Sequence, residues 1–503
     1  MSYSFNLVDN AWITCLTREG EYVEVSLFDL LTQAHRLEEI HGETPLVTAA
    51  IFPVALAVLH RVFGPKDEAE WRALWKQGAF DEARLEMYFR QWYERFELFG
   101  DGRRFYQERD SRFEKPKSMI HIVHAVANNA TLFTHLTNEA GVTLTCGEAA
   151  RQLVTGQYFH GGGLGGLPSA PFTDSILTRG VLFFAEGTTL FETFMLNLVR
   201  YPDTATMPSK PEDKPHWEMD EGVLPRRTPL GYLDYLTWQS SRFWLLPETT
   251  PQGEVVVRET LIAPSTKLDE KVFSPFKRYV SEDKKHEEFS FMCFSERKAL
   301  WRDYHSLLTI NSNAIKPPAV VRWLAELGVR MSLPPIRLMA IGMLADQAKQ
   351  IFYRQERMNL PQTLLGVENS DRVNAIQLAI AKASKVETAT RDAVKRLARE
   401  LLQRGGDGDP DPAKVTSLLD QWNATSVYWA ALEAPFWELV DRIARDDESA
   451  SVWWQEDVLR PSAQGALLYA ETLAGKDSAA FKGSVSAHRV LNFGLKKALN
   501  AVS

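Results

Sequence analysis

A histidine followed by three glycines, His160-Gly161-Gly162-Gly163, is the first candidate for chemistry in this 503-residue chain. The same order occurs in the oxyanion loops of lipases and esterases, where backbone N–H groups stabilise a developing negative charge. Such an enzyme also needs a downstream nucleophile elbow of the form GxSxG, and the nearest approach, GSVSA at 483–487, lacks the second glycine. A hydrolase that uses the HGGG loop therefore stays an alternative without an identified nucleophile.

The glycine-rich run 161–166 does not match a nucleotide-phosphate loop. A P-loop ends in Lys followed by Ser or Thr, and a dinucleotide fold needs GxGxxG after a strand, whereas Leu167-Pro168 follow here. His121 and His124 lie three residues apart, but neither an HExxH pattern nor a third ligand accompanies them. We therefore expect no metal site and no cofactor.

Consecutive glycines allow a backbone to approach a bulky partner closely, because residues without Cβ leave the N–H and C=O groups unshielded. The minor groove of DNA is one such target, since it is narrow and its pattern of donors and acceptors is degenerate. A surface loop without a ligand is the alternative. The glycines alone do not decide between the two.

Two basic segments also favour nucleic acid. Basic residues interleaved with aromatic ones can meet phosphates and stack on bases, although a solvated loop has the same composition. A basic helix surface in the C-terminal part can meet phosphate or be an ordinary helix surface. The first set is Arg103, Arg104, Arg109, Arg112, Lys115 and Lys117 with Phe105, Tyr106 and Phe113; the second is Lys385, Arg391, Lys395, Arg396, Arg399 and Arg404.

The overall composition is that of an ordinary globular protein, with 45% hydrophobic residues and a formal net charge of -8. The charge argues weakly against a stand-alone DNA-binding protein, so contacts to nucleic acid must come from local patches. The most apolar stretch, 46–59, is shorter than a membrane span and contains Pro53, which predicts a core helix. The three cysteines of the chain form no CxxC pair, and the first residues of the chain do not resemble a signal peptide. We expect a cytoplasmic protein.

The elements that must position these residues change along the chain. Short strands are expected in 3–27, helices in 26–99, an irregular region in 100–166 and antiparallel strands in 230–308. From 373 onward, apolar residues recur at three- and four-residue steps, with further helices expected near 413–429, 433–445, 450–473 and 484–502. The fold class is therefore α+β: a mixed domain over 1–365 with small antiparallel sheets and helices, followed by a four-helix bundle over 366–503.

Several motifs, taken in order, resemble the CasA family, the large subunits of the type I-E CRISPR surveillance complex called Cascade. The resemblance spans nearly the whole chain, and the shared order of the motifs carries it. The motifs are FNLVDNAWI at 5–13, GETPLVTAA at 42–50, VLHRVFGP at 58–65, RRFYQ at 103–107, NNATLFTH at 128–135, the glycines at 161–163, TRG at 178–180, MLNLV at 195–199 and LGYLDYLTWQ at 230–239.

The resemblance implies recognition of the protospacer-adjacent motif (PAM) on double-stranded DNA, while pairing with a guide RNA reads the target sequence. Gly161, Gly162 and Gly163 match a loop that enters the minor groove beside the PAM. A glutamine that wedges the strands apart matches Gln347, flanked by Asp346 and Ala348. A lysine finger in the minor groove matches either Lys267 or Lys271.

The resemblance also implies partners. Asn129, Phe133 and His135 lie in a loop like the one that contacts the guide RNA (crRNA) and the other Cascade subunits. The bundle resembles the part that positions DNA and helps recruit the helicase-nuclease. Such a subunit is non-catalytic and has no membrane partner. Cysteine pairs of some members are missing, so no metal is transferred, and Asp346 places a carboxylate where a neutral Asn can occur. A purely structural scaffold remains a further alternative.

Overall fold

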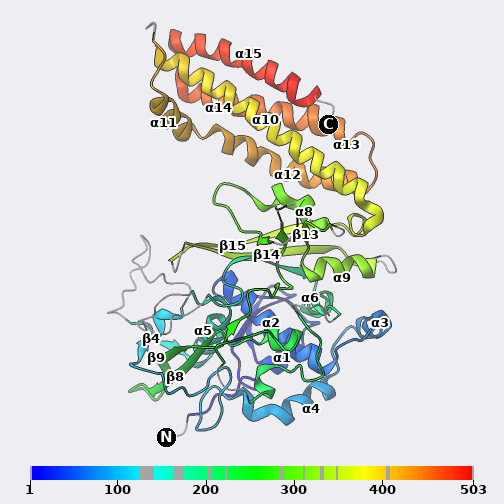
Figure 1. The fold of residues 1–503 in the computed structure, drawn as a ribbon, viewed down its shortest axis with the longest axis vertical. Helices are drawn as coiled ribbons and strands as arrows, with labels where there is room; N and C mark the ends of the chain where they lie inside the picture. The colour runs from blue at the N-terminus through cyan, green and yellow to red at the C-terminus, as the bar shows by residue number, and fades with distance from the viewer. Residues whose placement is uncertain are drawn as a thin grey trace. The chain divides into compact units, whose positions relative to one another are not determined.

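The computed structural model describes residues 3–123, 141–161, 174–200, 207–220, 224–281, 283, 285, 288–309, 312–328, 333–346, 349–403 and 408–500. The chain divides into two compact units (Figure 1). The first consists of 1–295 and 312–360, and the second of 296–311 and 361–503. The units are therefore not two consecutive pieces, because the segment 296–311 packs with the C-terminal helices.

The core of the first unit is built on helix α2 (Pro45–Val62). Thr44 caps the helix by accepting from the backbone N–H of Val47, and Pro45 occupies its first turn, where a missing N–H costs nothing. The helix is long and apolar enough to cross a membrane, yet 83% of it is buried inside the protein. The core helix predicted from 46–59 is thus confirmed.

Other helices of the first unit are short, and α4, α5 and α7 pack against α2. The sequence reasons are local, since Asp67, Asp81, Thr145 and Thr189 each cap a helix with the side chain. These helices are α1 (Leu27–Thr32), α3 (Glu68–Gln77), α4 (Glu82–Trp92), α5 (Cys146–Phe159), α6 (Leu190–Asn197), α7 (Tyr232–Leu236) and α9 (Ala319–Gly328).

The strands of this unit form small sheets, antiparallel except for one two-residue parallel pair. The N-terminal sheet has the order β2-β1-β3, with β1 at Ile13–Thr17, β2 at Tyr22–Val25 and β3 at Leu37–Ile40. A second sheet has the order β15-β14-β6, with β6 at Gly180–Glu186, β14 at Ile336–Asp346 and β15 at Lys349–Leu360.

The remaining strands lie mostly within the region where antiparallel strands were expected. Strands β8 (Ser241–Thr249) and β9 (Val255–Pro264) form a long hairpin, which confirms part of that expectation. Elsewhere in the described part of 230–308, the strands are two residues long. The short strands are β4 (Lys117–Ser118) and β5 (Leu144–Thr145) beside β9, β7 (Arg226–Arg227) paired with β10 (Lys267–Leu268), and β11 (Tyr279–Val280) between β12 (Ser290–Phe291) and β13 (Ile315–Lys316).

In the second unit, α10 (Ser370–Gln403), α12 (Ala424–Ala444), α14 (Arg460–Ala474) and α15 (Ser478–Asn500) pack as the expected four-helix bundle (Figure 1). Shorter helices complete it: α8 (Tyr304–Leu308), α11 (Pro412–Trp422) and α13 (Ala450–Trp453). The expected break between 429 and 433 is wrong, because α12 continues through Pro435. The break lies instead at Asn423, whose φ of 47° is the left-handed conformation that ends α11.

Candidate nucleic-acid interface

The glycine loop leaves the body of the first unit at the end of α5. A capping box starts this helix: Thr145 Oγ1 accepts from the Glu148 N–H, and Glu148 Oε2 accepts from the Thr145 N–H at 2.8 Å. The helix ends at His160, whose extended backbone leads into Gly161. Gly161 is half-buried, whereas Gly162 and Gly163 lie outside the described residues.

The chain is closed into a loop at its base. The backbone N–H of Ser175 donates to His160 O at 2.9 Å, and the N–H of Leu177 donates to Tyr158 O at 3.0 Å. Tyr158 itself is fully buried and donates from its hydroxyl to Leu236 O at 2.6 Å. The residues that flank the glycine loop are thus fixed by the core, independently of what the loop contacts.

His160 does not have the chemistry of a general base in this position. Burial lowers the pKa of its imidazole to about 4, with smaller contributions from His121 and Lys117. The ring lies edge-on against Phe243, at 6.0 Å between centroids. With its pKa lowered and its ring packed against Phe243, this histidine adds no support to the resemblance between HGGG and an oxyanion loop.

Lys277 binds the segment that follows the loop, and the sequence did not indicate this role for the lysine. Its ammonium group donates to Ile176 O at 3.0 Å and lies 5.2 Å from the centre of the Phe291 ring. Burial lowers its pKa to about 8. Nothing in the local sequence marks this lysine, because the signal is its contact with a carbonyl 101 residues away.

The residue that the family resemblance matches to a strand-separating wedge, Gln347, directly follows strand β14. Asp346 is the last residue of β14 and pairs with Lys349 of β15, so the connection consists of residues 347 and 348. Gln347 and Ala348 lie outside the described residues. The register shifts between Leu344 and Ala345, which is a bulge just before the turn. Bulges increase the local twist, so the two strands twist more strongly at this point.

The described segments that adjoin the glycine loop and the hairpin turn meet at one end of the same sheet. The segment 174–179, which returns from the loop, runs directly into β6. The first residue of β6, Gly180, pairs with Met343 of β14, three positions before Asp346. The close approach requires glycine on β14, because a Cβ at Gly342 would lie 2.6 Å from Gly180 O. The strands that adjoin these two motifs, β6 and β14, are thus neighbours although the motifs are far apart in sequence.

The two candidate lysines differ in exposure. Lys267 is half-buried at the start of β10, where it pairs with Arg226 of β7. Lys271 is exposed on the turn after that strand, and its backbone N–H donates to Asp269 Oδ1 at 3.0 Å. Of the two, Lys271 has the side chain that can extend furthest into solvent.

The basic and aromatic segment 103–117 is mainly structural. Phe105 and Tyr106 are 1% and 2% exposed, so these rings neither stack on bases nor belong to a solvated loop, the two interpretations that the sequence left open. Arg103 forms ion pairs with Glu108 and Asp220, and Arg104 lies 3.8 Å over the ring of Trp244. The sequence pattern could not reveal this, because tertiary contacts to residues more than 100 positions away bury the aromatic rings and occupy the arginines.

The basic residues of α10 lie on its solvent side. Lys385, Arg391, Lys395, Arg396 and Arg399 are all exposed, and Arg404 lies outside the described residues. Arg391, Lys395 and Arg399 are spaced by four positions and therefore share one helix face. Arg396 forms an ion pair with Glu400, which reduces its availability for phosphate.

The third predicted contact, made by Asn129, Phe133 and His135, also lies outside the described residues. Within the parts of the chain that the structure describes, no group of three His, Cys, Asp or Glu side chains could hold a metal ion. The cysteines are separate, with Cys15 buried, Cys146 half-buried and Cys293 exposed.

Comparison with known proteins gives one consistent result. The sequence profile of the family described as CRISPR-associated protein Cse1 matches residues 6–467. CRISPR-associated protein CasA/Cse1 of Thermus thermophilus is 29% identical, over 93% of this chain and 91% of its own length. The crystal structure of Cse1 from Acidimicrobium ferrooxidans superposes with a TM-score of 0.82 at 22% identity, covering 99% of both chains. A chain of a CRISPR RNA-guided surveillance complex superposes with a TM-score of 0.75 at 19% identity, over 97% of this chain and 99% of that one.

Proposed function

The chain belongs to the CRISPR-associated Cse1 family, and from that premise we propose that it is the large, non-catalytic subunit of a cytoplasmic, guide-RNA-directed surveillance complex. In this role it recognises the PAM on double-stranded DNA through the minor groove and starts strand separation. Its partners are the guide RNA, the other subunits of the complex, the DNA target and a helicase-nuclease that binds afterwards. The subunit itself performs no covalent chemistry.

The pairing of Gly180 with Met343 is the observation that best supports this proposal. Because β6 follows the glycine loop and β14 leads to the hairpin turn, a duplex held at the loop would lie near the residues that open it. Recognition and opening must be adjacent, since strand exchange starts next to the PAM and proceeds away from it. The exchange is nearly balanced energetically, so modest contacts at the start can tip it.

The guide-RNA contact is proposed for Asn129, Phe133 and His135, and DNA positioning for the exposed basic face of α10. The net charge of -8 means that the isolated chain has no general attraction for DNA, so both contacts depend on assembly. Recruitment of the helicase-nuclease is assigned to the second unit as part of the same proposal.

The decisive experiment measures binding of target duplexes by the guide-RNA complex assembled with and without this chain. The duplexes differ only at the PAM. We expect discrimination between them only when the chain is present, because guide pairing does not read the PAM. Binding that ignores both the chain and the PAM would contradict the proposal and favour a structural scaffold. Turnover of an ester by the purified chain would favour the hydrolase alternative.

Replacing Lys271 with Ala should lower the slope of log affinity against log salt concentration by about 1, because one phosphate contact is lost. The affinity should fall similarly for every target sequence. Replacing the half-buried Lys267 with Ala is the matched comparison and should leave the slope unchanged. Titrations over a range of salt concentrations measure both. A change of slope with Lys267→Ala alone would reverse the assignment of the lysine finger.

A further inference from the structure

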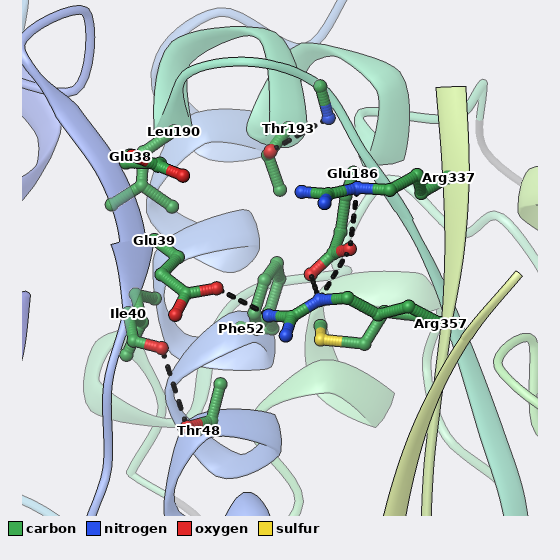
Figure 2. A pocket seen from close by; sticks show the side chains of 12 residues that line it. Glu38, Glu39, Ile40, Thr48, Phe52, Glu186, Leu190, Thr193, Arg337 and Arg357 are labelled. Carbon is green, nitrogen blue, oxygen red and sulfur yellow. Dashed lines mark hydrogen bonds and ion pairs between the residues drawn. The ribbon is translucent and has the colours of Figure 1, made fainter. Parts of the chain in front are cut away.

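An ion-pair cluster at the base of the β14–β15 hairpin joins three parts of the fold. Glu186 is the last residue of β6, Arg357 lies on β15, and Glu39 lies on β3 of the N-terminal sheet. Arg357 donates from Nε to both carboxylate oxygens of Glu186 at 3.0 Å, and from Nη2 to Glu39. Figure 2 shows the guanidinium between the two carboxylates, while Arg337 of β14 approaches Glu186 to 3.6 Å.

The charges in this cluster depend on one another. The Glu186 side chain is only 7% exposed, and this burial raises its pKa despite the opposing effect of Arg357 and Arg337. Burial alone would lower the pKa of Arg357, but Glu186 and Glu39 together raise it, so the guanidinium stays charged. Removing Arg357 would leave a buried carboxylate without its main partner, which is costly.

The cluster lies where it can restrain movement of the whole β14–β15 hairpin relative to the N-terminal sheet. Among the strands of the described residues, β15 lies at the edge of its sheet and pairs with β14. Within β14, pairing with β6 runs from Arg337 to Met343, so the last residues before the turn have no β6 partner. The ladder between β14 and β15 holds the two strands to each other. Arg357 adds a tie from the edge strand to a different sheet, through Glu39.

The cavity beside the cluster is too small to bind a substrate. The cavity that these residues line measures about 20 Å³, which is room for about one water molecule (Figure 2). Its charged lining includes Glu39, Glu186 and Arg357, which already pair with one another, and the rest of the lining is largely apolar or uncharged.

We propose that Glu186, Arg357 and Glu39 form a positioning anchor, which fixes the direction of the β14–β15 hairpin so that its end can separate DNA strands. The inference rests on the proposed function of the hairpin as a wedge. An anchored hairpin keeps its direction when the duplex resists opening, whereas a loosened one still meets the duplex but yields. The anchor therefore affects opening and leaves capture unchanged.

Arg357→Met tests the anchor in the assembled guide-RNA complex. Capture of a PAM-containing duplex should stay within about twofold of the wild-type rate, while strand opening should slow by about fivefold, a moderate rise of the barrier. Opening is followed by the fluorescence of 2-aminopurine placed beside the PAM. A target with a pre-opened bubble at that position should bind at the wild-type rate. Wild-type opening of the intact duplex, or an equal loss with the bubble target, would overturn the anchor.

Two further variants separate the anchor from general stability. Arg258→Met removes an Arg–Glu ion pair with Glu248 from the β8–β9 hairpin of the same unit, and it should open targets at the wild-type rate. Glu39→Gln keeps the Glu186 pair and weakens only the tie to β3, because it replaces the carboxylate that accepts from Arg357 with a neutral amide oxygen. It should slow opening by about twofold, since one of the two carboxylate partners remains. This variant serves as the test should Arg357→Met fail to fold, and wild-type opening with it would then overturn the anchor.

The same measurement keeps the two proposals distinguishable. If the complex without this chain opens targets as fast as the complete one, the proposed function fails. If opening requires the chain but Arg357→Met and Glu39→Gln open at the wild-type rate, only the anchor fails.

Discussion

Replacing Gly161, Gly162 and Gly163 together with leucine should reduce PAM-dependent binding by about 100-fold. The minor groove is only about 6 Å wide, so branched side chains on consecutive residues would keep the backbone from its floor. Each good contact to a base is worth about 1–3 kcal/mol, and loss of two accounts for the expected change. Binding of the complete complex to duplexes with and without the PAM measures the effect.

The substituted protein should remain folded, because the loop is closed by backbone hydrogen bonds from Ser175 to His160 and from Leu177 to Tyr158. Thermal unfolding checks this. Gly102→Leu is the matched control, since a Cβ there meets nothing within 4 Å and the backbone φ is not positive. That variant should bind as the wild type does. Full PAM discrimination by the triple-leucine variant would contradict the minor-groove role of the loop.

The parts of the fold that the sequence predicts best are those whose signal is local. Apolar residues in 46–59 predict α2, and three- and four-residue steps predict the bundle, because both patterns are read within one element. The ends of elements carry a weaker signal. Pro435 suggests a break, yet the buried Phe436 beside it keeps α12 in the bundle core. The left-handed Asn423 determines the real boundary, and asparagine in sequence has several other meanings.

In the candidate site, too, local features could be predicted from the sequence, whereas contacts between distant residues could not. Three glycines in a row are visible in the sequence, since no other residue type leaves a backbone so bare. The neighbouring positions of Gly180 and Met343 are not visible, because strand pairing across the chain is nonlocal. Arg357 contacts Glu186 across 171 positions and Glu39 across 318, which no periodicity can indicate. Phe105 and Tyr106 are the opposite case. Their local sequence suggests contact with nucleic acid, but both rings are buried in the core.

Replacing Gln347 with Ala should slow strand opening by about tenfold and change duplex capture by less than about twofold. Inserting a side chain between base steps costs a few kcal/mol of stacking, which the protein must repay with contacts made only as the strands part. A methyl group cannot occupy the space of the departing base, so the barrier to opening rises by about 1.4 kcal/mol for each tenfold loss of rate. In the proposed function, capture precedes this step and depends on the glycine loop.

Stopped-flow fluorescence of 2-aminopurine beside the PAM measures opening, and anisotropy of an end-labelled duplex measures capture. Gln355→Ala is the matched control, because this glutamine lies on the same hairpin and its amide contacts Met339 of the neighbouring strand. It should leave both rates near those of the wild type. An equal loss of both rates with Gln347→Ala would mean that the residue belongs to the capture surface. The β14–β15 hairpin would then hold the duplex closed against the glycine loop, and the force that separates the strands would have to come from guide pairing alone.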